Sequence, residues 1–172
     1  MIRPNLDHLP AYGFPEGYGM RHWHKDDLKL WITLNSPGFP EGEINEALFY
    51  EEYGRDDDLH QQRIYFLMHG DRPIGSISSW FGDDTYGEQY GKHTGRIHWV
   101  VIEEAYQGRG LSKPMMSYAC QKLVEFGHQS AWLHTDTVLI PAIGLYLQFG
   151  FQPDITSDEL QQACDETRKF VR

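Results

Sequence analysis

Residues 96–112 are RIHWVVIEEAYQGRGLS, and this stretch decides the fold that the sequence predicts. Its first half is rich in β-branched and aromatic residues, which favours a strand. Two glycines, Gly108 and Gly110, then mark a tight turn. After the turn, apolar residues recur at helical spacing, at Leu111, Met115, Ala119 and Leu123. A turn at the start of a helix presents free backbone N–H groups, and such a site suits a phosphate or pyrophosphate.

The composition indicates one globular domain over residues 1–172. The chain is 40% hydrophobic and 23% charged, and 172 residues are enough to bury a core. Residues 1–20 are rich in Pro, Gly and aromatic residues, so we expect an irregular lead-in there. The residues TSDE at 156–159 form a capping-box pattern. This pattern predicts a C-terminal helical extension over 154–172, with a plain surface turn as the alternative.

The net charge and the cysteine content limit the partners and the cellular location that the sequence predicts. The net charge is -10, and no basic stripe stands out, so we expect no nucleic-acid partner. An acidic surface favours a cationic acceptor such as an amine, although a charge that only keeps the chain soluble is the simpler interpretation. Cys120 and Cys164 lie far apart, which predicts a reduced, cytoplasmic chain. Because no apolar run approaches ~20 residues, and residues 1–7 lack the apolar core of a signal peptide, we expect no membrane partner.

The remaining hydrophobic pattern predicts strands and helices on both sides of this stretch. Strands are predicted over 18–23, 63–68, 74–81 and 131–135. Helices are predicted over 26–34, 43–53 and 141–149, with a polar break at 54–58 and a long loop at 82–95. Residues 63–81 should form an antiparallel hairpin. Strand 131–135 should lie parallel to strand 96–102, because a helix connects them.

The glycine turn alone is not specific. It lacks the Walker A pattern GxxxxGK[ST] and the dinucleotide pattern GxGxxG. Two glycines before a helix often serve only the geometry of a tight turn. The turn by itself therefore leaves phosphate binding and a purely structural role equally open.

A second motif, PAIGLYLQFGF at residues 141–151, makes the turn specific. Together the two motifs resemble those of the GCN5-related N-acetyltransferase (GNAT) superfamily. The pattern Q/R-x-x-G-x-G/A is met by Gln107, Gly110 and Ser112, with serine in the position of the last small residue. The pattern A-x-x-L-Y-x-x-x-G-F is matched by Ala142, Leu145, Tyr146, Gly150 and Phe151. The resemblance spans residues 60–153 and implies an α/β fold: a mixed, strongly twisted sheet with helices on both faces and a splayed central parallel strand pair.

The resemblance implies acetyl-CoA as the co-substrate. Val100, Val101 and Ile102 would pair with the pantetheine arm through their backbone groups. The pyrophosphate would lie against the turn and helix start, formed by Gln107, Gly108, Arg109, Gly110, Leu111, Ser112 and Lys113. Arg109 and Lys113 would add positive charge, unless they are simply solvated. Leu139 stands where many members carry an Asn that contacts the cofactor, so that contact is not carried over.

The resemblance also implies a general acid for the transfer. The thiolate of CoA must gain a proton as it leaves. Tyr146 is the candidate, because a phenol is protonated at neutral pH and reaches out from a helix. The structural alternative is a core tyrosine that packs against the neighbouring strand.

The general base is less sharply indicated. His134, on the predicted strand 131–135, titrates near neutrality and is one candidate. Glu103, at the end of the strand before the turn, is another. His98 is a further candidate, since strand alternation predicts that it shares a face with Val100 and Ile102. The structural alternatives are a histidine satisfied within its strand and a solvated carboxylate.

The predicted function is direct transfer of an acetyl group from acetyl-CoA to an amine of a small molecule or peptide. The alternatives are a non-catalytic acyl-CoA-binding regulatory module, an acyltransferase with another acyl donor or a hydroxyl acceptor, and a glycine-turn protein without a CoA site. No metal is predicted, because His22 and His24, with His8 nearby in the sequence, lack a fixed third ligand. Members of the superfamily often dimerise, which makes a homodimer an expectation of the resemblance.

Overall fold

The computed structural model describes residues 1–81, 90–91, 93–155, 161–162 and 165. Its strands are β1 (Ile2–Arg3), β2 (Tyr18–His22), β3 (Ile64–His69), β4 (Arg72–Trp80), β5 (Thr94–Ile102) and β6 (Ser130–Trp132). Its helices are α1 (Leu28–Asn35), α2 (Glu46–Tyr53), α3 (Asp57–Arg63), α4 (Ser112–Glu125) and α5 (Ile140–Gln148), with a 3-10 turn η2 (Glu104–Tyr106) before α4. The predicted strand, turn and helix are therefore present as β5, η2 with its glycines, and α4.

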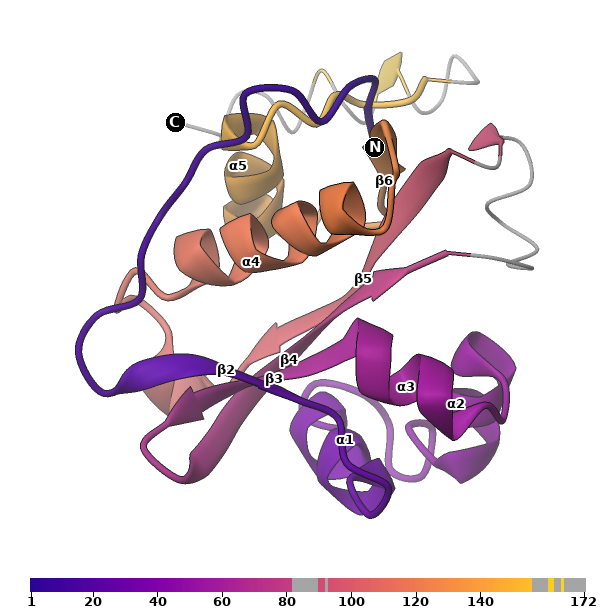
Figure 1. Cartoon of the computed structure of the whole chain (residues 1–172), viewed down its shortest axis with the longest axis vertical. Coiled ribbons are helices and arrows are strands. Elements are labelled where there is room, and N and C mark those ends of the chain that lie inside the picture. The colour runs from indigo at the N-terminus through magenta and orange to yellow at the C-terminus, as the bar shows by residue number, and fades with distance from the viewer. Residues whose placement is uncertain (82–89, 92, 156–160, 163–164, 166–172) are drawn as a thin grey trace.

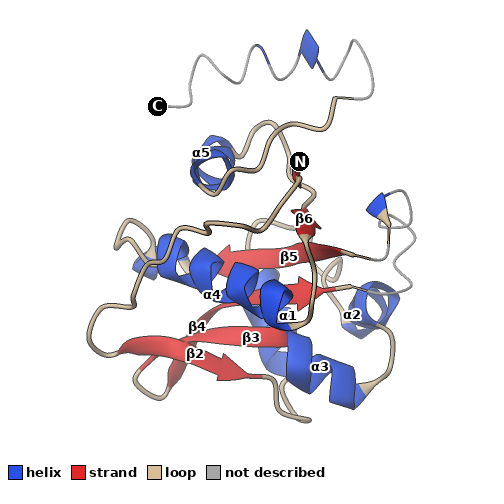
Figure 2. Cartoon of the chain, turned by 45° about the horizontal axis from the view of Figure 1, so that its top comes forward, coloured by secondary structure: helices blue, strands red, loops and turns tan. Residues whose placement is uncertain are grey.

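The strands form one mixed sheet in the order β1-β6-β5-β4-β3-β2. Figure 2 shows β2 to β5 side by side with α4 lying across them. The pair β5–β6 is parallel, and the other neighbouring pairs are antiparallel. The crossover through α4 makes β5 and β6 parallel, as a strand–helix–strand connection requires. The predicted mixed sheet is confirmed.

Helices cover both faces of this sheet (Figure 1). On one face, α4 and α5 pack on the sheet in a core that contains the whole predicted stripe of Leu111, Met115, Ala119 and Leu123. On the other face, α1 and α2 pack through an aromatic core that includes Trp31, Phe49 and Tyr53. We call the first of these the α4–α5 face and the second the α1–α3 face. The predicted arrangement of helices on both faces is confirmed.

The two parallel strands separate early. They pair only at Thr94 with Ser130, Gly95 with Ala131, and Arg96 with Trp132. Strand β6 ends at Trp132, whereas β5 continues to Ile102. Beyond Arg96, β6 therefore no longer pairs with β5. This separation of the two strands is the predicted splay.

A bulge changes which way β5 side chains point. Trp99 has a φ of 48°, and the register with β4 shifts between Ser76 and Ser78. A bulge adds one residue and interrupts strict alternation. As a result, Val100 and Ile102 pack on the α4–α5 face, whereas His98 contacts α2 on the α1–α3 face. The prediction that His98 shares a face with Val100 and Ile102 is therefore wrong.

Three other elements differ from the sequence-based expectation. The polar break at 54–58 contains the start of α3, where the Asp56 carboxylate caps the helix by accepting from the N–H groups of Asp58 and Leu59. The lead-in is not irregular throughout, because β1 pairs with β6. Strand β6 is shorter than predicted and ends before His134. The loop residues 82–89 and the capping-box pattern at 156–159 lie outside the described residues.

Candidate active site

The glycine turn has the geometry of an anion-binding loop. Gly108 and Gly110 have φ values of 72° and 76°, which only glycine adopts without strain. No atom lies within 4 Å of the position that a Cβ would take at either residue, so the turn is open to a ligand. Helix α4 follows at Ser112, with no capping side chain and no acidic residue in its first turn. The N–H groups and the positive end of the helix dipole therefore face this turn without a negative side chain beside them.

Two basic side chains lie beside the turn. The Arg109 guanidinium donates to the Ala105 carbonyl oxygen at 2.9 Å and lies 4.7 Å from the ring centre of Tyr106. The Lys113 ammonium lies 5.4 Å from the ring centre of Tyr12. Both residues stand within three positions of Gly110 in the sequence. In a chain of net charge -10, this local charge is what a polyanion needs.

The backbone of β5 lines the splay between the strands. Val100, Val101 and Ile102 come after the last β5–β6 pair at Arg96. Their other edge is taken by β4, since Val101 pairs with Ser76 and Ile102 with Gly75. The Gln107 side-chain amide donates to the Ile102 carbonyl oxygen at 2.9 Å, which ties the end of the strand to the turn. A chain-like ligand placed in the splay can pair with β5 as an added strand.

Tyr146 projects from α5 into the core of the α4–α5 face, and 6% of it is exposed. Its ring lies 6.3 Å from that of Phe151. Burial raises the pKa of its hydroxyl to about 12, so the phenol stays protonated at neutral pH. No described residue hydrogen-bonds this hydroxyl. Tyr146 therefore places a protonated hydroxyl in the core of the α4–α5 face.

The two other predicted catalytic residues come from different segments than Tyr146. His134 is exposed and follows the end of β6 rather than lying on a strand. Glu103 makes an ion pair with Arg72, with Nη2 and Oε2 2.8 Å apart, at the outer end of β5. The exposed Leu139, which replaces the family's Asn, lies at the N-terminus of α5. The structure does not bring His134 and Glu103 together.

Sequence analysis missed a partly buried charged group on the opposite face. The Glu52 carboxylate, on α2, accepts a hydrogen bond from His98 Nε2 at 2.7 Å and lies 3.6 Å from the Arg96 guanidinium. The hydrogen bond from His98 lowers the pKa of the Glu52 carboxyl, and the charge of Arg96 lowers it further, so Glu52 is ionised. Glu52 falls inside the predicted helix 43–53, but its partners come from a strand distant in sequence. No local pattern signals that contact.

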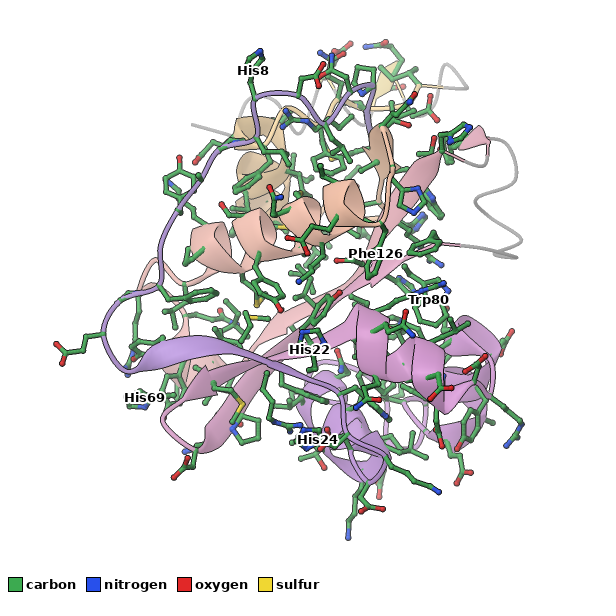
Figure 3. The ribbon with its side chains drawn as sticks, in the orientation of Figure 1. His8, His22, His24, His69, Trp80 and Phe126 are labelled. Carbon is green, nitrogen blue, oxygen red and sulfur yellow. The ribbon has the colours of Figure 1, made fainter. Side chains whose placement is uncertain are left out.

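The histidines considered for a metal do not gather. Figure 3 shows His8 on the N-terminal segment, away from His22 and His24. His22 instead contacts the Gln61 carbonyl and the Tyr118 hydroxyl, at 3.0 and 3.2 Å. Within the described ranges, no three His, Cys, Asp or Glu side chains lie close enough to hold a metal ion. In the same ranges, every helix is too short or too polar to serve as a membrane span.

Comparison with curated proteins finds one informative relative. The chain is 25% identical over 150 residues to the mycothiol acetyltransferase of Pseudarthrobacter chlorophenolicus. The match covers 83% of this chain and 45% of that protein, so the chain spans less than half of the relative's length.

Solved structures share the fold at low sequence identity. An aminoglycoside acetyltransferase from an uncultured soil metagenomic sample, in complex with trehalose, has a TM-score of 0.64 and 12% identity, covering 84% of this chain and 96% of that one. A Clostridium acetobutylicum protein described as a predicted acetyltransferase with acetyl-CoA has a TM-score of 0.60 and 17% identity, covering 81% and 93%. Other matched structures are much longer, and the chain covers only 19% to 48% of three of them.

The family assignment comes from the sequence itself. Residues 20–151 match the family described as acetyltransferase (GNAT) family. The matched range contains the glycine turn, the splayed strands and the helix that carries Tyr146. Because this range is more than half of the chain, the protein belongs to the acetyltransferase (GNAT) family.

Proposed function

We propose that the chain is an acetyl-CoA-dependent N-acetyltransferase that moves the acetyl group directly to an amine of a small molecule or peptide. The observation that carries this proposal is the splay between β5 and β6, which opens beside a glycine turn at the start of α4. The family uses acetyl-CoA, and one structural relative is described with it. Tyr146 supplies a protonated phenol on the α4–α5 face of the splay.

The residues present fit acetyl-CoA along its length. The open N–H groups around Gly108 and Gly110 suit its pyrophosphate, with Arg109 and Lys113 as nearby positive charges. The unpaired edge of β5 suits the amide-containing pantetheine arm. When bound, acetyl-CoA supplies the thioester carbonyl that the amine attacks. Tyr146, which is protonated at neutral pH, then donates its proton to the departing thiolate.

For the acceptor we propose a cationic amine. The net charge of -10 favours a cationic acceptor, and a structural relative is described as an aminoglycoside acetyltransferase. We place the reaction in the cytoplasm, where the free, buried Cys120 would stay reduced. A homodimer stays a prediction of the family resemblance, and the absence of nucleic-acid and membrane partners stays a prediction from the net charge and the apolar pattern of the sequence.

The test measures thiol release from acetyl-CoA across a panel of amines, with Tyr146→Phe assayed beside the wild type. We expect CoA at about 100 times its dissociation constant to stabilise the protein by about 2.7 kcal/mol. We expect Tyr146→Phe to lower kcat about 100-fold, because the acid is lost while the ring and its packing remain.

Tyr118→Phe is the matched control, since Tyr118 lies on α4 and its hydroxyl contacts His22 rather than the splay. Its kcat should equal that of the wild type. Unchanged activity in Tyr146→Phe would remove Tyr146 from the acid role. CoA binding without thiol release from any amine would favour a non-catalytic module. Thiol release only with hydroxyl acceptors would identify a hydroxyl group rather than an amine as the acceptor. Thiol release only with longer acyl-CoA donors would identify another acyl donor.

A further inference from the structure

The proposed acetyl-CoA site runs from the glycine turn along β5, and this direction locates the acyl end of the donor. The inference that follows from it rests on the proposed function. The pyrophosphate end lies at Gly108 and Gly110, and the arm runs back along β5 from Ile102. Four residues of strand from Ile102 to His98 span about 13 Å. The strands converge at the pair Arg96–Trp132, where the splay closes. The acyl end of the donor therefore falls near the bulge at His98 and Trp99.

The two faces of the sheet offer different groups at this point. Tyr146 lies in the core of the α4–α5 face. Glu52 and His98 lie on the α1–α3 face, where the bulge at Trp99 has turned His98 toward α2. With the thiolate leaving beside Tyr146 on the α4–α5 face, the amine would reach the carbonyl carbon from the α1–α3 face. The α1–α3 face is therefore the side on which an acceptor needs a base.

The Glu52–His98 pair has the geometry of an oriented histidine and its carboxylate partner. Nε2 of His98 and Oε2 of Glu52 are 2.7 Å apart, and an ionised carboxylate can only accept, so Nε2 carries the hydrogen. Among the described residues, the pair is faced by Arg96 from β5, 3.6 Å from Glu52, by the Tyr53 ring from α2, 5.3 Å from the His98 ring, and by the Trp99 ring, 5.9 Å from the His98 ring. The Tyr53 hydroxyl is engaged with Ser78 of β4 at 2.8 Å. The Glu52 side chain remains 22% exposed, which leaves the pair a route to the surface.

We infer that the Glu52–His98 pair is the base on the acceptor side of the transfer, with Arg96 as a positioning residue that holds the Glu52 carboxylate. An amine acceptor is an ammonium ion at neutral pH, and its nitrogen cannot attack until one proton leaves. The pair takes up that proton and becomes an imidazolium–carboxylate ion pair, in the way that carboxylates stabilise histidine bases elsewhere. Two partners at hydrogen-bond distance share the proton, so they act as one titrating unit.

Bonds and protons balance over one turnover. The ammonium gives one proton to the Glu52–His98 pair. The free amine forms the N–C bond, and the C–S bond then breaks. The second proton passes from the nitrogen to water as the amide forms. The thiolate gains one proton from Tyr146, and Tyr146 regains one from water. The pair releases its proton to water, so each turnover yields one amide, one thiol and one proton.

The experiment measures kcat/KM against pH with acetyl-CoA and four amine probes: spermidine, glucosamine, tyramine and lysine amide. Glu52→Gln and His98→Gln should each lower kcat/KM about 100-fold at neutral pH. Both variants should lose the ascending limb that the wild type shows as pH rises through neutrality. The double variant should be no slower than the slower single variant, because the two residues act as a unit. Glu51→Gln is the matched control, since Glu51 is the exposed neighbour on the same helix.

Folding and binding are followed separately, so the two proposals fail in different ways. Each variant should keep the wild-type melting-temperature rise with CoA. In His98→Ala, added imidazole should restore part of the rate, which a purely structural histidine would not show. Wild-type kcat/KM in Glu52→Gln or His98→Gln, or no imidazole rescue, overturns the inference while the transferase stands. No CoA-dependent stabilisation and no thiol release by the wild type overturns the proposed function.

Discussion

At the scale of a single residue, the proposed anion site at the turn depends on the backbone conformation of Gly110. Its φ is 76°, and a Cβ built there meets no atom within 4 Å. An alanine would fit sterically but would carry a backbone strain of about 1–2 kcal/mol. The chain can relieve that strain by rotating the adjoining peptides, which turns their N–H groups away from the ligand. We expect Gly110→Ala to raise the dissociation constant of CoA about tenfold, or 1.4 kcal/mol, in a calorimetric titration.

Gly38→Ala provides the control for this prediction. Gly38 has a φ of 93° and equally open surroundings, but it lies in the connection between α1 and α2. It should lose a similar amount of stability and bind CoA as the wild type does. Equal CoA affinity in Gly110→Ala and the wild type would show that the turn does not contact the ligand.

Single residues also show where prediction from sequence stops. The glycines, Tyr146 and the residues of the second motif stand in short, nearly continuous stretches, so a local pattern located them. The contact between Glu52 and His98 joins residues 46 positions apart. It further depends on the bulge at Trp99, which reverses the face that alternation assigns to His98. A pattern of period two contains no signal for such an inserted residue.

At the scale of elements, α5 is held in place by the N-terminal strand. The buried Arg3 guanidinium donates to the carbonyl of Phe149 at the end of α5, and to those of Asn5 and Asp7. Ile2 also bridges to Gln152 beyond the helix. The helix that carries Tyr146 therefore depends on residues that precede the rest of the fold.

Arg3→Met tests this dependence, because methionine fills space but donates no hydrogen bond. Three carbonyls then lose charged donors, and leaving such groups unpaired costs about 3 kcal/mol in total. Urea unfolding should show this loss. Arg55→Met is the control, since Arg55 is exposed and rests on the Tyr50 ring at 4.0 Å, a contact worth about 0.5–1 kcal/mol. Equal losses in the two variants would contradict the anchoring role of Arg3.

At the scale of the whole molecule, the central strands of the sheet were predicted from the sequence better than strand β1 and helix α3. The strand–turn–helix unit and the hairpin were found because their patterns are long and regular. Strand β1 has only two residues and pairs with a strand near the other end of the chain. Helix α3 is polar apart from Leu59 and the buried His60, so its period is weak. In both elements, contacts with residues distant in sequence, rather than the local pattern, determine the structure.

Two buried groups should make the whole fold sensitive to acid. Burial lowers the pKa of His128 below its ordinary 6.5. The hydrogen bond from His98 lowers the pKa of Glu52 below its ordinary 4.5. In both cases the unfolded chain binds a proton more readily than the folded protein, so stability rises with pH. The contribution of His128 is complete above pH 6.5 and is lost as pH falls through its lower folded value, and that of Glu52 is lost below 4.5.

The contribution of His128 can be tested by itself, because a substitution removes this group and leaves the other titrating groups in place. Among the described residues neither ring nitrogen of His128 has a hydrogen-bond partner, and the ring packs 4.3 Å from that of Phe81. His128→Leu keeps an apolar contact with Phe81 and removes the titrating group. We expect its urea midpoint to fall less than that of the wild type between about pH 7.5 and about pH 5.5. His24→Leu, at an exposed histidine, should keep the wild-type slope. Parallel slopes in all three proteins would mean that acid acts through other groups.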